Sequence, residues 1–139
     1  MQGSSELLAA NNFVSMAKRK LSSTNSINRE ALMKACGSMY ATIILSGRWK
    51  LKIIYALAKG DTRFSELKEY IPNISDRMLT LQLRELENDQ LIERTVFPEV
   101  PPRVEYRMTE STKKLFSVLQ SLEKWGNEHK ENLSETNKH

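Results

Sequence analysis

Hydrophobic residues recur at helical spacing over the first third of the chain. From 5 to 21 they fall three or four positions apart on one stripe, which predicts an amphipathic helix. The polar run at 22–26 interrupts this pattern and is expected to be a linker. Asn28 then predicts the N-cap of a second helical region, which runs to Gly47 with a break near Gly37.

Three shorter apolar segments follow, each bounded by a turn or cap residue. Their spacing predicts helices over 49–58 and 64–71, and Pro72 ends the second of these. Ser75 is expected to cap a helix at 76–88, because its hydroxyl accepts from backbone N–H groups of the first turn. The stripe that this helix is expected to bury consists of Leu79, Leu83 and Leu86.

The hydrophobic period changes to two after this helix. Segments at 92–96 and 103–108 mix apolar residues with arginine and glutamate in a strand-like pattern, which predicts a two-stranded hairpin. Three of the four prolines lie between the strands and predict a stiff, protruding loop. Thr109 is expected to cap a last helix, in which apolar residues recur at heptad-like spacing from Leu115 to Leu133.

This order of elements predicts a mainly α fold with a small β-wing. Helix, turn, helix and wing is the arrangement of a winged helix-turn-helix domain of the MarR-like kind. We expect a helical arm and linker at 1–27, the winged domain with a C-terminal dimerisation helix at 28–133, and a polar tail at 134–139. The arm and the last helix, whose stripe of Leu115, Leu119, Leu122 and Trp125 exceeds what one small domain can cover, are expected to form a homodimer.

Composition narrows the classes of protein without choosing among them. The chain has 139 residues, of which 40% are hydrophobic and 27% charged, as expected for one domain with a hydrophobic core. It has no apolar run near the roughly 20 residues of a membrane span, and its start is not expected to be a signal peptide. The single cysteine, Cys36, favours a cytoplasmic location, and the net charge of +4 permits a polyanionic partner.

The helix after Ser75 has a face that suits DNA. Opposite its buried leucines lie Arg77, Thr80, Leu81 and Arg84. In a major groove, an apolar Leu81 can contact thymine methyl groups, while the arginines reach guanine edges or phosphates. The helix N-terminus at Ser75 offers N–H groups to a phosphate. The alternative is a solvated face with one stray leucine.

Three further basic residues are candidate DNA contacts. Arg103 stands beside the prolines of the predicted loop, where its guanidinium could enter a minor groove. Arg63 and Lys50 are candidate phosphate contacts. Each of the three could instead be an ordinary surface charge.

The sequence offers few residues that could catalyse a reaction or bind a cofactor. His129 and His139 have no second ligand at metal spacing, and no phosphate-binding loop or nucleophile–base set is present in the sequence. We therefore expect no metal, no cofactor and no enzymatic activity. A redox-sensing Cys36 is a separate hypothesis, set against a cysteine that acts as a small apolar residue.

Several ordered motifs resemble one family, the HxlR-type winged helix-turn-helix regulators of prokaryotes. They are Gly47-Arg48-Trp49-Lys50, Arg63-Phe64-Ser65-Glu66-Leu67, Ile74-Ser75, Met78-Leu79-Thr80, Leu83-Arg84-Glu85-Leu86-Glu87 and Val100-Pro101-Pro102-Arg103-Val104-Glu105-Tyr106. The resemblance implies a homodimer that activates or represses transcription, with a recognition helix at 76–88. A double-stranded inverted-repeat operator and a small-molecule or electrophile inducer are the expected partners, since some relatives sense electrophiles through a cysteine at the place of Cys36.

The sequence departs from the family pattern at three places. Gly37 replaces the usual proline after the cysteine, Gln90 replaces the glycine usual before the wing, and the N-terminal arm is longer. Two rival hypotheses remain beside DNA-binding regulation. One is a winged-helix module that binds proteins rather than DNA, and the other is a small redox enzyme that uses Cys36.

Overall fold

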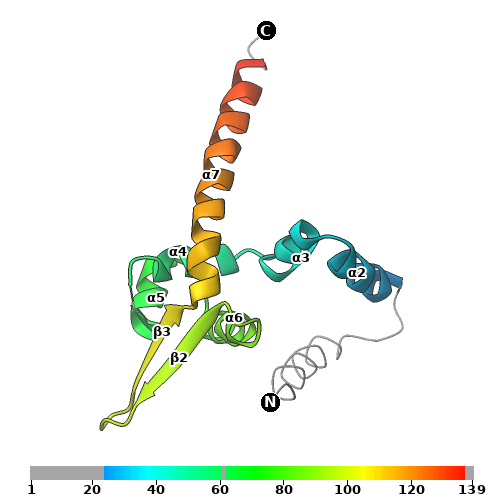
Figure 1. Ribbon diagram of the computed structural model, residues 1–139. Helices are drawn as coiled ribbons and strands as arrows, with labels where there is room; N and C mark the ends of the chain where they lie inside the picture. Colours follow the sequence, from blue (N-terminus) through cyan, green and yellow to red (C-terminus); the bar gives the residue numbers. More distant parts are fainter. Residues whose placement is uncertain (1–23, 61, 137–139) are drawn as a thin grey trace.

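The computed structural model of the protein describes residues 24–60 and 62–136 (Figure 1). Its elements in chain order are α2 (Thr24–Ala35), α3 (Gly37–Ile44), α4 (Lys50–Leu57), β1 (Thr62–Arg63), α5 (Phe64–Tyr70), α6 (Asp76–Asn88), β2 (Ile92–Phe97), β3 (Arg103–Met108) and α7 (Glu110–Thr136). The helix predicted at 5–21 lies outside the described residues. The observed order confirms a mainly α fold with a winged helix-turn-helix arrangement.

The helices before the winged domain begin and end earlier than predicted. α2 starts at Thr24, so the expected linker is partly helical and Asn28 lies inside the helix rather than at its N-cap. Serine, threonine and asparagine cost a helix less than about 0.7 kcal/mol each, which is too little to keep this turn unfolded. The break near Gly37 is confirmed, since Cys36 separates α2 from α3. α3 ends at Ile44, and Gly47 takes its positive φ of 113° in the turn that follows.

The hydrophobic core lies among α4, α5, α6 and the base of the wing (Figure 1). The fully buried side chains include Ile53 and Ile54 of α4 and Leu67 of α5. Leu79, Leu83 and Leu86 of α6 are at most 2% exposed, which confirms the predicted inward stripe. Burying side chains of this kind stabilises a fold by about 1.5–3 kcal/mol each, so these contacts fix α6 against the domain.

A three-stranded antiparallel sheet in the order β1-β3-β2 forms the wing and its base. In the predicted hairpin, Ile92 pairs with Met108 and Phe97 pairs with Arg103. β1 was not predicted, because a strand of two residues is too short to show a period. Gln90 has a φ of 57° in the turn before β2, so this residue does adopt the left-handed conformation that glycine would take more easily.

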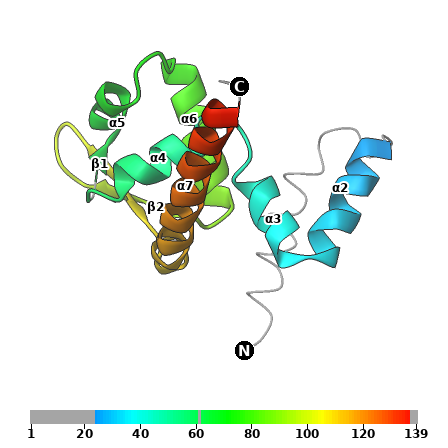
Figure 2. The same cartoon turned by 90° about the horizontal axis from the view of Figure 1, so that it is seen from above.

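α7 leaves the domain as a long helix that projects away from the wing (Figure 1). Its N-terminal part is anchored, since Leu119 is 3% exposed and Leu115 packs against the core. The two leucines therefore serve the domain itself, which corrects their assignment to a dimer stripe. The helix also continues past Leu133 to Thr136, so three residues of the predicted polar tail are helical. Viewed from above, α2 and α3 lie on one side of α7 and α5 on the other (Figure 2).

Candidate nucleic-acid interface

The turn between α5 and α6 is held by a lysine of α5 that bonds to the residues on either side of Ser75. Lys68 donates to the carbonyl oxygen of Ile74 at 2.7 Å and forms an ion pair with Asp76 at 2.8 Å. Ser75 then caps α6, as predicted, by accepting from the backbone N–H of Met78 at 3.1 Å. Because Asp76 also lies at the positive end of the helix, it favours this helix start. The start of α6 is thereby fixed relative to α5.

The outward face of α6 carries the residues that the sequence analysis selected. Arg77 and Arg84 are exposed, Thr80 is half-buried, and Leu81 is 45% exposed. Within the described part of the chain, neither arginine has a hydrogen-bond or ion-pair partner. These guanidinium groups are therefore available to an external anion or base, without first leaving a carboxylate.

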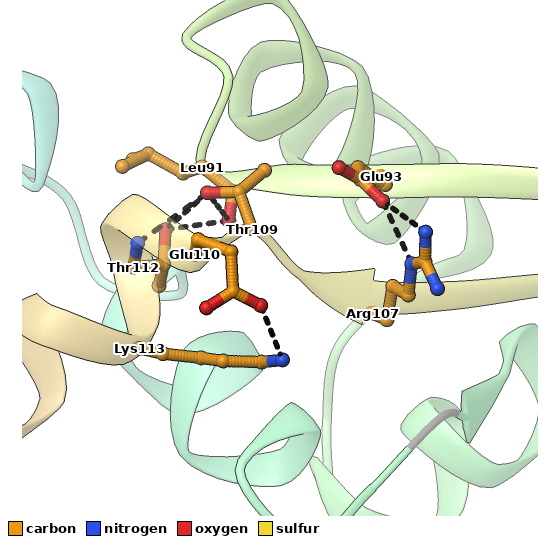
Figure 3. A network of polar contacts seen from close by, with 7 residues as sticks. All are labelled: Leu91, Glu93, Arg107, Thr109, Glu110, Thr112 and Lys113. Atoms are coloured by element: carbon orange, nitrogen blue, oxygen red, sulfur yellow. Dashed lines mark hydrogen bonds and ion pairs between the residues drawn. The ribbon is translucent and has the colours of Figure 1, made fainter.

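The base of the wing is tied to the start of α7 by a hydroxyl network (Figure 3). Thr112 is fully buried, and its hydroxyl donates to the carbonyl oxygen of Leu91 at 2.6 Å. Thr109 donates to the carbonyl oxygen of Gln90 at 2.9 Å, and its own hydroxyl oxygen accepts from the N–H of Thr112, which confirms Thr109 as the helix cap. Arg107 and Glu93 pair across the two strands at 2.7 Å. The wing is therefore a rigid extension of the domain.

Arg103 lies at the start of β3, and its guanidinium contacts acidic residues of the wing itself. It pairs with Glu99 at 3.1 Å and with Glu105 at 3.2 Å, and it lies 4.0 Å from the centre of the Phe97 ring. Its side chain is 29% exposed. The loop that it supports is apolar at its tip, where Val100 is fully exposed. In this arrangement Arg103 holds the wing together rather than projecting beyond it.

The two other candidate phosphate contacts differ in accessibility. Arg63 is exposed at the N-cap of α5 and lies 4.0 Å from Glu105, which is shared with the wing. Lys50 is only 7% exposed, and its ammonium group pairs with Glu85 of α6 at 3.0 Å. A buried, paired lysine does not present its charge to a phosphate, so we leave Lys50 out of the proposed interface.

Cys36 lies between α2 and α3 with its thiol exposed to solvent. The sulfur is 3.0 Å from the hydroxyl oxygen of Ser38, at the N-terminal end of α3. Hydrogen bonds from that hydroxyl, and then from the backbone of Met39 and Ser38, lower the pKa of the thiol below its ordinary value. Lys34 pairs with Glu30 at 3.2 Å, and it is not among the groups that lower this pKa.

A second exposed surface is apolar and lies away from the outward face of α6. On α7 the exposed apolar residues are Val118, Leu122, Trp125 and Leu133, each more than half exposed. Leu32, Met39 and Tyr40 are exposed on α2 and α3. His129 stacks on Trp125 with ring centres 5.1 Å apart, so it extends this surface. Large exposed apolar patches mark protein–protein contacts.

Within 24–60 and 62–136, no group of three or more His, Cys, Asp or Glu residues is arranged to hold a metal ion. None of the helices in those two ranges is both long and apolar enough to cross a bilayer.

Comparison with known proteins decides the family. Residues 44–134 match the HxlR-like helix-turn-helix family. The chain belongs to this family. An HTH-type transcriptional regulator of Methanothermobacter thermautotrophicus is 46% identical over 103 residues, which are 72% of this chain and 79% of that protein. This HxlR-family protein is therefore a transcriptional regulator of the helix-turn-helix type, and its relatives are regulators rather than enzymes.

Solved structures of regulators with similar sequences show the same winged fold. The redox regulator HypR in its oxidized form is 39% identical, with a TM-score of 0.61 over 67% of this chain and 96% of HypR. Diamide-treated YodB from Bacillus subtilis is 40% identical, with a TM-score of 0.60 over 67% of this chain and 93% of YodB. Both alignments leave about a third of this regulator uncovered.

Two features of the interface were missed by the sequence analysis. The first is Lys68, which bonds to the residues on either side of Ser75 and which no sequence pattern singles out. The second is the pairing of Arg103, for which a signal existed, since Glu99 and Glu105 lie four residues before it and two after it. Residues two apart on a strand share a face, so an arginine with such neighbours is expected to pair.

Proposed function

We propose that this HxlR-family regulator binds a specific duplex DNA site by placing the outward face of α6 in the major groove. The observation that carries the proposal is a pair of guanidinium groups, those of Arg77 and Arg84, that have no partner among the described residues and lie on a helix whose opposite face is buried. Arginine suits guanine edges and phosphates, and the exposed Leu81 between them suits a thymine methyl group. The N-terminus of α6 at Ser75 and the hydroxyl of Thr80 complete a compact contact surface.

The rest of the interface follows from the position of the wing. A rigid hairpin beside the recognition helix contacts the adjacent minor groove or its sugar–phosphate walls. Arg63 adds a phosphate contact at the start of α5. Arg103 reaches DNA only if it exchanges one of its two carboxylate partners for a phosphate.

The regulator acts as a homodimer in this proposal, and its operator is an inverted repeat. The apolar surface of α7, together with that of α2 and α3, is the area that a second copy of the chain would cover. A two-fold dimer presents two copies of α6, and these match half-sites about one helical turn apart, or a multiple of it.

The experiment is selection of operator sites from random and genomic duplexes, followed by binding titrations at several salt concentrations. Specific sites with a dyad are expected, and the logarithm of affinity should fall linearly with the logarithm of salt concentration. A winged-helix module that binds proteins, which the exposed Leu81 also suits, predicts no enrichment of any site. If no site is enriched, the proposal of DNA binding is wrong and the protein-binding module takes its place.

A thiol response at Cys36 is the finer part of the proposal. It is supported by an exposed sulfur with a lowered pKa, and by solved relatives that are named as an oxidized redox regulator and as a diamide-treated protein. With one cysteine per chain, oxidation leads to an intersubunit disulfide, a mixed disulfide with a small thiol, or an adduct. Each of these would change the region between α2 and α3, and so the geometry of the dimer.

The test compares operator binding by the wild-type protein and by Cys36→Ser, before and after treatment with diamide or a quinone. We expect the wild type to change its affinity and the variant to keep it. Equal responses would leave Cys36 with a packing role alone.

A further inference from the structure

Lys50 is a buried charge at the point where three helices meet. It opens α4, and its side chain is 9% exposed. The ammonium nitrogen lies 3.0 Å from a carboxylate oxygen of Glu85 on α6, and it donates to the carbonyl oxygen of Ile44 at 3.4 Å. Lysine is almost never buried unless it is paired. One cation therefore joins the last residue of α3, the first residue of α4 and the last turns of α6.

The neighbouring charges come from the same elements. Asp89 follows α6 as its C-cap, and its N–H donates to the carbonyl oxygen of Glu85 at 2.9 Å. Burial raises the pKa of Asp89, while the charges of Lys50 and, more weakly, Arg29 on α2 act to lower it. Glu85 of α6 and Asp89, the C-cap that follows the helix, therefore both interact with the cation of α4. Lys50 thereby links the C-terminal end of α6 to the last residue of α3.

We propose that Lys50 is a positioning residue that couples residues 24–44 to the recognition helix, so that the ion pair with Glu85 sets the direction of α6 relative to α2 and α3. The inference rests on the proposed function, in which α6 contacts DNA. Lys50 itself touches no DNA. In a dimer that α2, α3 and α7 hold together, the direction of α6 in each subunit sets the distance between the two half-sites that the protein accepts.

A purely structural role makes a different prediction. Breaking a buried pair by removing one partner leaves an uncompensated charge, so the free energy of unfolding falls in either case. If the lysine only stabilises the fold, the folded molecules still prefer the wild-type spacing between half-sites. If it positions α6, the preference for that spacing weakens among molecules that are fully folded.

The experiment measures binding to duplexes in which two selected half-sites are separated by spacers that differ by single base pairs, and to a duplex with one half-site. The variant is Lys50→Met, used at a temperature where circular dichroism shows it folded. The matched control is Lys113→Met, which removes the same charge from an exposed pair with Glu110 at 2.8 Å. We expect Lys50→Met to reduce the ratio of affinities for the best and the neighbouring spacings about fivefold or more, the lower end of typical coupling between sites. Affinity for the single half-site and the ratio measured for Lys113→Met should stay at their wild-type values.

A second variant tests the link from its other end. Glu85→Gln should reduce the same ratio, and the double variant should lose no more than either single one, because both remove one interaction. The side chain of Glu85 is 33% exposed. Glu85→Gln can therefore be used to test the inference even if Lys50→Met does not fold. A wild-type spacing ratio in either folded variant, or losses that add in the double variant, would overturn the inference. A wild type that binds no duplex specifically would overturn the proposed function and this inference with it, whereas an unchanged ratio in the variants overturns the inference alone.

Discussion

Two arginines of α6 and two arginines of the wing are in opposite electrostatic states. Arg77 and Arg84 project from α6, and neither has a partner among residues 24–60 and 62–136. In the wing, Arg103 pairs with Glu99 and Glu105, and Arg107 pairs with Glu93. The two pairs carry similar sequence signals, yet only the pair on α6 presents guanidinium groups that have no acidic partner among the described residues. A basic residue contributes its charge to an interface only to the extent that acidic partners within the protein do not already neutralise it.

The largest effects are expected at the unpaired arginines. Arg77→Ala or Arg84→Ala should weaken operator binding by about 1–3 kcal/mol where the residue reads a base, with relaxed preference at one position. The midpoint of thermal unfolding should not change, because neither guanidinium has an internal partner. Titration of each variant against the selected operator and its single-base variants measures both effects. Unchanged affinity in both folded variants would show that α6 does not lie in the groove.

A smaller effect of opposite sign is expected in the wing. Glu99→Gln removes one partner of Arg103 and frees that charge for a phosphate. An exposed ion pair is worth about 0.2–1 kcal/mol, so affinity should rise by no more than about fivefold, and the salt dependence should steepen by about one phosphate contact. Arg103→Ala is the comparison, since it removes the same pair together with the cation and should weaken binding evenly across sequences. If Glu99→Gln leaves both affinity and salt dependence unchanged, Arg103 keeps its contacts within the hairpin when the protein binds DNA.

The smallest effect concerns a charge at the far end of α6. Burial raises the pKa of Asp89 above its ordinary value of 3.8, so the folded state binds this proton more tightly than the unfolded state. The free energy of unfolding therefore falls as the pH rises through the interval between the two pKa values. Asp89→Asn should be more stable than the wild type above that interval and equal to it below. Urea unfolding of both proteins at acidic and neutral pH measures the difference. A less stable variant at neutral pH would show that attraction to Lys50 outweighs burial.

Much of the recognition helix could be predicted because its signals are local. The cap at Ser75, the inward leucines and the outward arginines depend only on the position of each residue along one helix. These features needed no knowledge of which other segments lie nearby. The unusual turn at Gln90 was indicated only by the family resemblance, in which a glycine is usual at this place.

The features that sequence reasoning missed depend on partners brought in by the fold. Lys50 has the same local signature as an exposed lysine, and only the approach of α6 places Glu85 beside it. Leu115 and Leu119 belong to a regular heptad-like stripe. The first part of that stripe packs against the core of the domain, and the rest is exposed. β1 forms because its two residues pair with the edge of β3. A sequence of two residues carries no pattern that could predict this pairing.

In the proposed dimer, the length of α7 links the folding of one subunit to the presence of the other. Its 27 residues extend about 40 Å, and none of the residues from 120 to 136 is buried within the single chain. Most of the stability of a helix in a protein comes from the packing of its amphipathic face, so the far half of α7 is stabilised mainly by what packs against it. Its helical content should then depend on protein concentration, because the ordering of this segment and the association of two subunits become one equilibrium. At concentrations where subunits separate, the lost ellipticity would come from the end of α7, while the winged domain stays folded.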